Sequence, residues 1–136
     1  MRRKVFVDTG YFLALLRKRD SLHQVAVIAS EEYDGPFVTT DLVLVEIANA
    51  LSSPAYRASA VGFVEKIRSD KNTKVVPFGP DGMSNAFTLY KKRLDKEWGL
   101  VDCFSFVTMK ENRTRVALTF DDHFRQAGFD VPLLVL

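Results

Sequence analysis

Short apolar runs alternate with longer amphipathic segments along this chain, and that alternation restricts the possible fold more than any other feature. An unbroken apolar run of a few residues is typical of a strand buried on both faces, as parallel sheets require. The longer segments between the runs then predict helices that cross from one strand to the next. The expected strands are Val5–Val7, Phe37–Thr39, Lys74–Phe78, Arg115–Thr119 and Leu133–Leu136.

The segments between these runs carry helix start and stop signals. Ser21 with Gln24 matches a capping box, Thr40 or Asp41 can cap the next helix, and Ser53-Pro54 opens the one after it. The expected helices are Tyr11–Leu16, Ser21 to the Asp34-Gly35-Pro36 turn, Asp41–Leu51, Pro54–Ser69, Asp81–Leu94, Asp102–Glu111 and Asp121–Ala127. We therefore expect an α/β fold of three layers, with one parallel sheet covered by helices on both faces.

Length and charge favour a single soluble domain spanning residues 1–136. A chain of 136 residues can bury roughly two thirds of its unfolded surface, and no linker interrupts the pattern. The apolar run before Asp8 is too short for a signal peptide or a membrane span, so we expect a cytoplasmic protein with no membrane partner. The single cysteine, Cys103, excludes an internal disulfide and is expected to pack as a small hydrophobe.

Four acids separated by dozens of positions suggest a site. Each falls at the C-terminal end of an expected strand or in the first turns of a helix, where parallel sheets build active sites. They are Asp8, Glu46, Asp102 and Asp121. Two carboxylates about 4 Å apart repel by roughly 4 kcal/mol at an effective dielectric near 20, and a divalent cation would relieve that repulsion. The pattern points to metal-assisted phosphodiester chemistry.

Glu46 is the acid hardest to assign a structural role. Its helical neighbours three and four residues away are Leu42, Val43, Asn49 and Ala50, none of them basic. It also lies too far from Thr40 to complete a capping box. The alternative is a partner supplied by a distant lysine or arginine.

The other three acids admit a simpler reading as helix caps, which does not exclude metal binding. Asp8 and Asp102 each stand where a helix is expected to begin. Asp121 is favoured over its neighbour Asp122 as the acid facing the cavity, since the chain then continues onto an exposed turn. His23 and His123 are not favoured as ligands.

Basic residues gather in three clusters, Arg2-Arg3-Lys4, Arg17-Lys18-Arg19 and Lys91-Lys92-Arg93. The net charge is only +2, but with the four acids set aside as metal ligands the balance of 19 basic and 13 acidic side chains is +6. Such clusters can hold a phosphate backbone. They are equally compatible with ordinary solvated helix ends and a charged terminus.

Four short motifs in a fixed order resemble a known family. They are Val5-Phe6-Val7-Asp8-Thr9, Thr40 with Glu46, Leu100-Val101-Asp102-Cys103 with Ser105-Phe106-Val107, and Leu118-Thr119-Phe120-Asp121-Asp122-His123-Phe124 running into Gln126-Ala127-Gly128-Phe129. Over essentially its whole length the chain resembles the PIN-domain ribonucleases, especially the VapC-type toxins. One departure is Asp122, where relatives often carry a basic or neutral residue.

The resemblance implies a five-stranded parallel sheet in the order 3-2-1-4-5 and a metal-dependent endoribonuclease. It makes Asp8, Glu46 and Asp102 ligands of Mg²⁺ or Mn²⁺, with Asp121 binding directly or through water. Thr9, Thr119 and Ser105 are candidate accessory hydroxyls. The implied partners are an RNA substrate, a small antitoxin and a second copy of the chain, while Tyr56 and Trp98 are either partner contacts or core residues.

Other functions fit the sequence less well. A response-regulator receiver would need paired acids after the first strand, where Thr9 and Gly10 follow Asp8, and a haloacid-dehalogenase phosphatase would need an aspartate in place of Gly10. A PIN-fold protein that binds RNA or regulates a partner with little turnover stays open as the alternative. For the nuclease, metal-assisted attack by water predicts products with 5′ phosphate and 3′ hydroxyl ends.

Overall fold

A computed structural model describes residues 3–134, and its centre is a parallel sheet of four strands. The strands lie in the order β3-β2-β1-β4. Their bounds are β1 Val5–Val7, β2 Phe37–Thr40, β3 Thr73–Val76 and β4 Val116–Leu118. The register pairs Val7 with Leu118, so the ends of β1 and β4 lie side by side. The predicted parallel arrangement is confirmed for these four strands.

The expected fifth strand at Leu133–Leu136 does not form in the part of the chain that is described. Leu133 lies in a turn, and residues 135 and 136 fall outside the described range. The place beside β4 is taken by one parallel bridge between Val116 and Asp130, whose N–H donates to the Arg115 carbonyl at 2.8 Å. Pro132 follows closely and has no N–H to give to a ladder, which limits the pairing here to a bridge.

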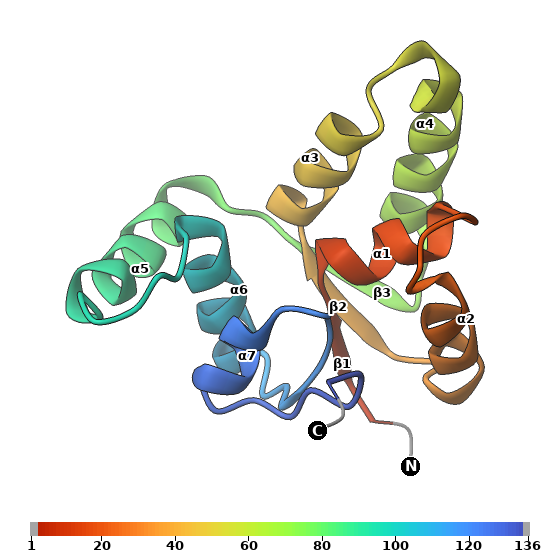
Figure 1. Ribbon diagram of the computed structural model, residues 1–136. Coiled ribbons are helices and arrows are strands. Elements are labelled where there is room, and N and C mark those ends of the chain that lie inside the picture. Colours follow the sequence, from red (N-terminus) through yellow and green to blue (C-terminus); the bar gives the residue numbers. More distant parts are fainter. Residues whose placement is uncertain (1–2, 135–136) are drawn as a thin grey trace.

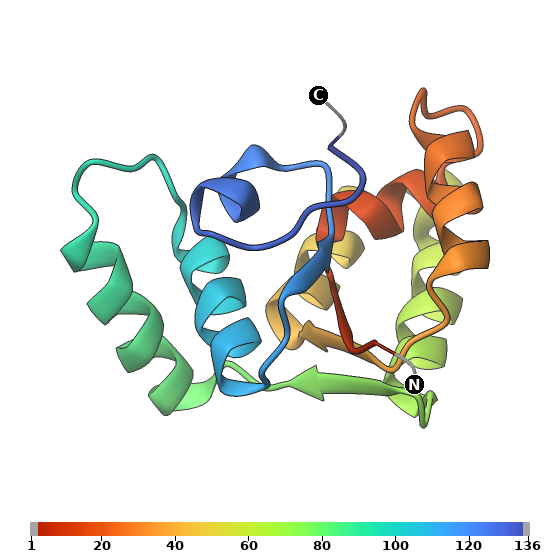
Figure 2. The same ribbon diagram turned by 90° about the horizontal axis from the view of Figure 1, so that it is seen from below.

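Seven helices flank the sheet within residues 3–134. They are α1 Thr9–Leu16, α2 His23–Glu32, α3 Asp41–Ala50, α4 Pro54–Ser69, α5 Gly79–Lys92, α6 Leu100–Glu111 and α7 Asp122–Gln126. Figures 1 and 2 show α1, α2 and α4 on one side of the strands, with α5, α6 and α7 on the other. The expected layering is therefore present.

The capping box expected at Ser21 is wrong. Helix α2 begins at His23, and its N-cap residue Leu22 offers no side-chain acceptor. Asp20 instead accepts a hydrogen bond from the Leu22 N–H at 2.8 Å, which forms a tight turn before the helix. The expected cap at Thr40 is confirmed, because its hydroxyl accepts from the Val43 N–H at 3.1 Å.

Aromatic packing holds α6 and α7 against the first strand. Phe6, Phe106 and Phe124 are almost fully buried, and the rings of Phe106 and Phe124 meet edge to face at 5.0 Å. Trp98 packs on Phe106 at the same centroid distance. Edge-to-face pairs favour one fixed orientation, so this cluster sets where the N-terminal ends of α6 and α7 lie relative to β1.

Cys103 is fully buried, and burial raises the pKa of its thiol, in line with the predicted role as a small hydrophobe. Among residues 3–134, no helix combines the length and apolar character needed to cross a bilayer.

Candidate active site

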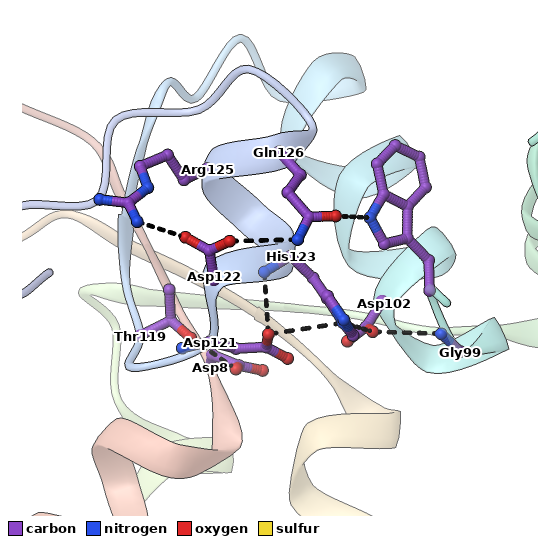
Figure 3. A network of polar contacts seen from close by, with 10 residues as sticks. Asp8, Gly99, Asp102, Thr119, Asp121, Asp122, His123, Arg125 and Gln126 are labelled. Atoms are coloured by element: carbon purple, nitrogen blue, oxygen red, sulfur yellow. Dashed lines mark hydrogen bonds and ion pairs between the residues drawn. The ribbon is translucent and has the colours of Figure 1, made fainter. Parts of the chain in front are cut away.

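The adjacent ends of β1 and β4 bring Asp8 and Asp121 to the same edge of the sheet. The Asp8 N–H donates to the Leu118 carbonyl at 3.1 Å, which continues the strand pairing by one residue. Thr119 then joins the two segments: its hydroxyl donates to Asp8 Oδ2 at 2.8 Å and accepts from the Asp121 N–H at 3.0 Å (Figure 3). The predicted orienting role of Thr119 thus has a definite geometry.

Asp8 occupies the N-cap position of α1, but its carboxylate does not cap the helix. Its side chain instead accepts the Thr119 hydroxyl and lines a cleft beyond the sheet edge. Side-chain capping therefore does not account for Asp8, whose carboxylate faces the cleft with Oδ2 held by Thr119.

Glu46 reaches the cleft from α3. Its Oε1 accepts a hydrogen bond from the Thr9 hydroxyl at 2.6 Å, which links α3 to the first residue of α1. Within the described residues, no lysine or arginine lies within ion-pair distance of this carboxylate. The alternative of a distant basic partner is therefore not found for Glu46.

Asp102 lies in the first turn of α6, where it acts differently from the expected N-cap. Gly99 is the N-cap, and the Asp102 carboxylate reaches back to accept its N–H at 3.2 Å. The same oxygen lies 2.9 Å from His123 Nδ1, as Figure 3 shows. Two hydrogen bonds from different elements thus hold Asp102 at the edge of the cleft.

His123 connects Asp102 to Asp121. Its backbone N–H donates to Asp121 Oδ1 at 2.9 Å, and its ring nitrogen Nδ1 lies 3.4 Å from the same oxygen. Ligand atoms of these three residues all lie within 4.8 Å of one another, a spacing compatible with one shared ion. From the sequence, His123 was not favoured as a ligand, because Asp122 and His123 were expected to lie on an exposed turn.

The structure places His123 at the second position of a short helix, half-buried, and not on the expected exposed turn. Asp121 is the N-cap of α7, and the first helical turn carries the imidazole of His123 back over the cap rather than into solvent. The signal in the sequence is the Asp-x-His spacing at a helix start, which brings both side chains to one place. Asp122, between them, is exposed and forms an ion pair with Arg125.

All four predicted acids line one cleft of about 580 Å³. Its lining consists of Asp8, Thr9, Gly10, Leu13, Glu46, Ala50, Asp102, Thr119, Phe120, Asp121 and Asp122. No lysine or arginine is among these residues. Ser105 lies apart from the cleft: it is buried in α6, and its hydroxyl has no hydrogen-bond partner within the described residues.

The electrostatics of the cleft appear most clearly at Asp8. Burial raises the pKa of Asp8 from 3.8 to about 7, against the hydrogen bonds from Thr119 and the Thr9 N–H that lower it. The negative charges of Asp102 and Glu46 raise it further. The pKa of His123 is raised, mainly by its hydrogen bond to Asp102. Beside the larger effects of burial at Asp8 and of the hydrogen bond at His123, nearby carboxylates raise both pKa values, and this negative charge favours a cation in the cleft.

Comparison with known proteins identifies the family. Residues 5–130 match the PIN domain family. The chain belongs to it. A PIN-domain relative of 27% identity, the 23S rRNA-specific endonuclease VapC20 of Mycobacterium tuberculosis, aligns over 125 residues, 92% of this chain and 95% of the relative.

Solved structures of PIN-fold proteins agree. The crystal structure of M. tuberculosis VapC20, a sarcin-ricin loop cleaving toxin, superposes with a TM-score of 0.83 and 27% identity over 93% of this chain and 96% of that one. FitAcB from Neisseria gonorrhoeae superposes with a TM-score of 0.65 at 17% identity, covering 93% and 95% of the two chains. VapBC2 from Rickettsia felis, bound to a promoter DNA fragment, superposes with a TM-score of 0.63 at 12% identity, covering 97% of this chain and 96% of that one. The last two likenesses show the fold alone.

Proposed function

We propose that this PIN-domain protein is a metal-dependent endoribonuclease that hydrolyses RNA phosphodiester bonds, and that it is the toxin component of a toxin-antitoxin pair. The observation that carries the proposal is the meeting of four carboxylates, from four separate segments, in one cleft without a lysine or arginine in its lining. Support comes from the VapC20 relatives, whose name describes an endonuclease specific for 23S rRNA.

The donor set suits a hard divalent cation. We propose Asp8, Glu46, Asp102 and Asp121 as the residues that hold Mg²⁺ or Mn²⁺, because both ions favour carboxylate oxygens. When bound, such an ion lowers the pKa of a coordinated water and offsets the charge that develops on the phosphate. His123 Nδ1 lies between Asp102 and Asp121 as a hydrogen-bond partner, so the carboxylate oxygens are the proposed ligands.

The surrounding side chains are proposed to orient the ligands. Thr9 holds Glu46, Thr119 holds Asp8, and the Gly99 N–H with His123 holds Asp102. These donors fix Oε1 of Glu46, Oδ2 of Asp8 and Oδ2 of Asp102. Ligands fixed in this way need little reorganisation when an ion or a phosphate arrives.

Cleavage of RNA tests the proposal directly. The purified protein is incubated with total RNA and with 23S rRNA in Mg²⁺, in Mn²⁺ and in EDTA, and the fragment ends are sequenced. We expect metal-dependent cuts with 5′ phosphate and 3′ hydroxyl ends, lost in the Asp8→Asn and Asp102→Asn proteins. Asp95→Asn is the matched control and should still cleave, because Asp95 is exposed, paired with Arg93 and absent from the lining of the cleft.

Two results would contradict this assignment. Cyclic 2′,3′ phosphate ends would indicate attack by the ribose hydroxyl rather than by water. Equal RNA binding without cleavage in the wild type and in the Asp8→Asn and Asp102→Asn proteins would favour the alternative, a PIN-fold protein that binds RNA or regulates a partner.

An antitoxin and a second copy of the chain are the proposed protein partners. Large apolar side chains remain exposed on α5 and just beyond it, with Phe87 stacked on Tyr90 and Leu94 90% exposed. Exposed apolar patches on a small domain commonly mark contacts with other proteins. Light scattering of the purified chain, alone and co-expressed with its genomic neighbour, measures both associations, and a monomer in each sample would refute them.

A further inference from the structure

A second hollow, also about 580 Å³, adjoins the acidic cleft. Ala50 lines both, and α1 runs from one to the other, with Thr9 and Leu13 in the cleft and Leu16 in the hollow. We call this second hollow the basic groove. It is lined by Leu16, Arg17, Lys18, Arg19, Asp20, Ala50, Leu51, Ser53, Ala55, Tyr56 and Ser59. Two chain segments thus form its walls, the end of α1 with the following loop and the junction of α3 with α4.

The charge of the basic groove is opposite to that of the cleft. Arg17, Lys18 and Arg19 are consecutive, and in the described part of the chain their side chains form no ion pair or hydrogen bond. Asp20 is the single acid of the lining; it belongs to the turn before α2, and its Oδ1 accepts a hydrogen bond from the Leu22 N–H. Three cations without protein partners beside four acids are arranged for a ligand that carries negative charge along its length.

Tyr56 adds an aromatic surface to the same groove. It lies in the first turn of α4, two residues after Pro54, and is 54% exposed. In the described residues its ring makes no aromatic or cation contact with another side chain. An exposed ring among arginines and lysines suits an unpaired nucleobase, which stacks on an aromatic face while the cations hold its phosphates.

We propose that the basic groove binds the single-stranded RNA segment that flanks the scissile bond, with Arg17, Lys18 and Arg19 on phosphates and Tyr56 stacked on a base. The inference rests on the proposed function, since it names how that site selects and holds its substrate. At 1.5 Å per residue, the eight residues from Thr9 to Arg17 place the cations about 12 Å from the acids. A stacked strand advances about 3.4 Å per nucleotide, so the groove meets the chain roughly three or four nucleotides from the cut.

RNA binding without cleavage tests the groove on its own. Fluorescence anisotropy measures the dissociation constant of a fluorescein-labelled twelve-nucleotide oligouridine in EDTA, across a series of KCl concentrations. We expect the triple variant Arg17→Gln, Lys18→Gln, Arg19→Gln to bind at least about tenfold more weakly at low salt. Each phosphate contact to a single strand contributes about 0.7 to the slope of log affinity against log salt, so the slope should fall by about 2.

A second triple variant controls for net charge. Lys66→Gln, Arg68→Gln and Lys71→Gln remove the same three charges from the end of α4 and the turn before β3. That turn lies at the N-terminal edge of the parallel sheet, opposite the cleft, so binding should stay within about threefold of wild type. Equal weakening in both triple variants would show a general charge effect and would overturn the proposal.

Tyr56 is tested by a pair of substitutions. Stacking on one base is worth about 1–3 kcal/mol, so Tyr56→Leu should weaken binding about fivefold or more, whereas Tyr56→Phe keeps the ring and should bind like wild type. Unchanged affinity in Tyr56→Leu would overturn the stacking role. A wild-type dissociation constant weaker than about 100 μM at low salt would overturn the groove as an RNA site, since non-specific binding alone reaches that range.

Three further outcomes separate this inference from others. If the first triple variant loses binding to a labelled oligoglutamate peptide but keeps oligouridine binding, the groove serves an acidic protein and the RNA assignment is wrong. If metal-dependent cleavage is present while both triple variants bind RNA normally, the groove proposal fails and the nuclease proposal stands. If RNA binding behaves as expected but no protein cleaves, the nuclease proposal fails alone.

Discussion

Replacing Asp8 by asparagine should stabilise the metal-free protein at neutral and alkaline pH. The pKa of Asp8 lies near 7 in the folded chain against 3.8 when exposed, so folding favours its protonated form. The folded state then holds a proton that the unfolded state has lost, and the free energy of unfolding falls as pH rises from about 4 to 7. A shift of about three units corresponds to about 4 kcal/mol at pH 8. Asparagine carries no charge and can still accept the Thr119 hydroxyl, so this loss should disappear.

Urea unfolding in EDTA at pH 5 and pH 8 measures the difference. Part of the loss has already occurred at pH 5, because the unfolded carboxyl is ionised there, so the wild type should lose roughly 2.5 kcal/mol more than Asp8→Asn between the two pH values. Asp122→Asn is the flat control: the Gln126 and Arg125 side chains lower the pKa of that exposed carboxyl, so it is ionised in both states at pH 5 and at pH 8, and this variant should change with pH in parallel with the wild type. An equal change of unfolding free energy with pH in the wild type and in Asp8→Asn would refute the claim that burial and nearby negative charges disfavour the ionised form of Asp8.

Divalent cations should reverse the order of stability. An ion that binds only the folded state stabilises it by about 2.7 kcal/mol at one hundred times its dissociation constant. The free energy of unfolding of the wild type should therefore rise in millimolar Mg²⁺ or Mn²⁺, while that of Asp8→Asn, which has one ligand fewer, should rise less. A melting temperature of the wild type that ignores both ions would contradict the proposed metal site.

Two more predictions concern His123 and the packing of α5. His123→Asn should destabilise the metal-free protein most below pH 6.5, and the difference from the wild type should shrink as pH rises through the raised pKa of His123. Equal losses of unfolding free energy at pH 5.5 and pH 9 in urea would count against the pair with Asp102. Gly82→Ala places a Cβ 2.8 Å from the Phe104 ring, between α5 and α6, and should destabilise the protein by about 1–3 kcal/mol. Gly62→Ala on α4, where a Cβ would have nothing within 4 Å, should stabilise the protein by up to about 1 kcal/mol. Similar shifts in melting temperature for both variants would show that the Phe104 ring moves aside without cost.

The strands were predictable because both of their faces are buried. Val5, Phe6 and Val7 are each no more than 1% exposed, so the sequence there is apolar without alternation. The ends of strands were less predictable, as β3 shows: it was expected to reach Phe78 but ends at Val76. Pro77 removes the next donor, and the Phe78 N–H donates to the Asp41 carboxylate at 3.0 and 3.2 Å instead of to a strand.

The site acids were predictable for a different reason, namely the lack of a local role for them. Glu46 has no basic neighbour on its helix, and the structure places it against Thr9 in the cleft. The sequence spacing indicates that His123 lies beside Asp121, but its contact with Asp102 could not be predicted, because that contact depends on how α7 packs against α6 through Phe106 and Phe124. Contacts of this kind join residues far apart in the chain and leave no periodic signal.

The partner of each acid separates structural carboxylates from those of the cleft. Asp95 is paired with Arg93, and Asp122 is paired with Arg125, three residues further along the chain. Arg125 is also four residues from Asp121, but it pairs with Asp122 and not with Asp121. The cleft acids receive hydrogen bonds from Thr9, Thr119, backbone N–H groups and one histidine. Neutral hydroxyl and amide donors fix the direction of a carboxylate without cancelling its charge. An arginine paired with one of these carboxylates would instead fill the position that a cation from solution must take.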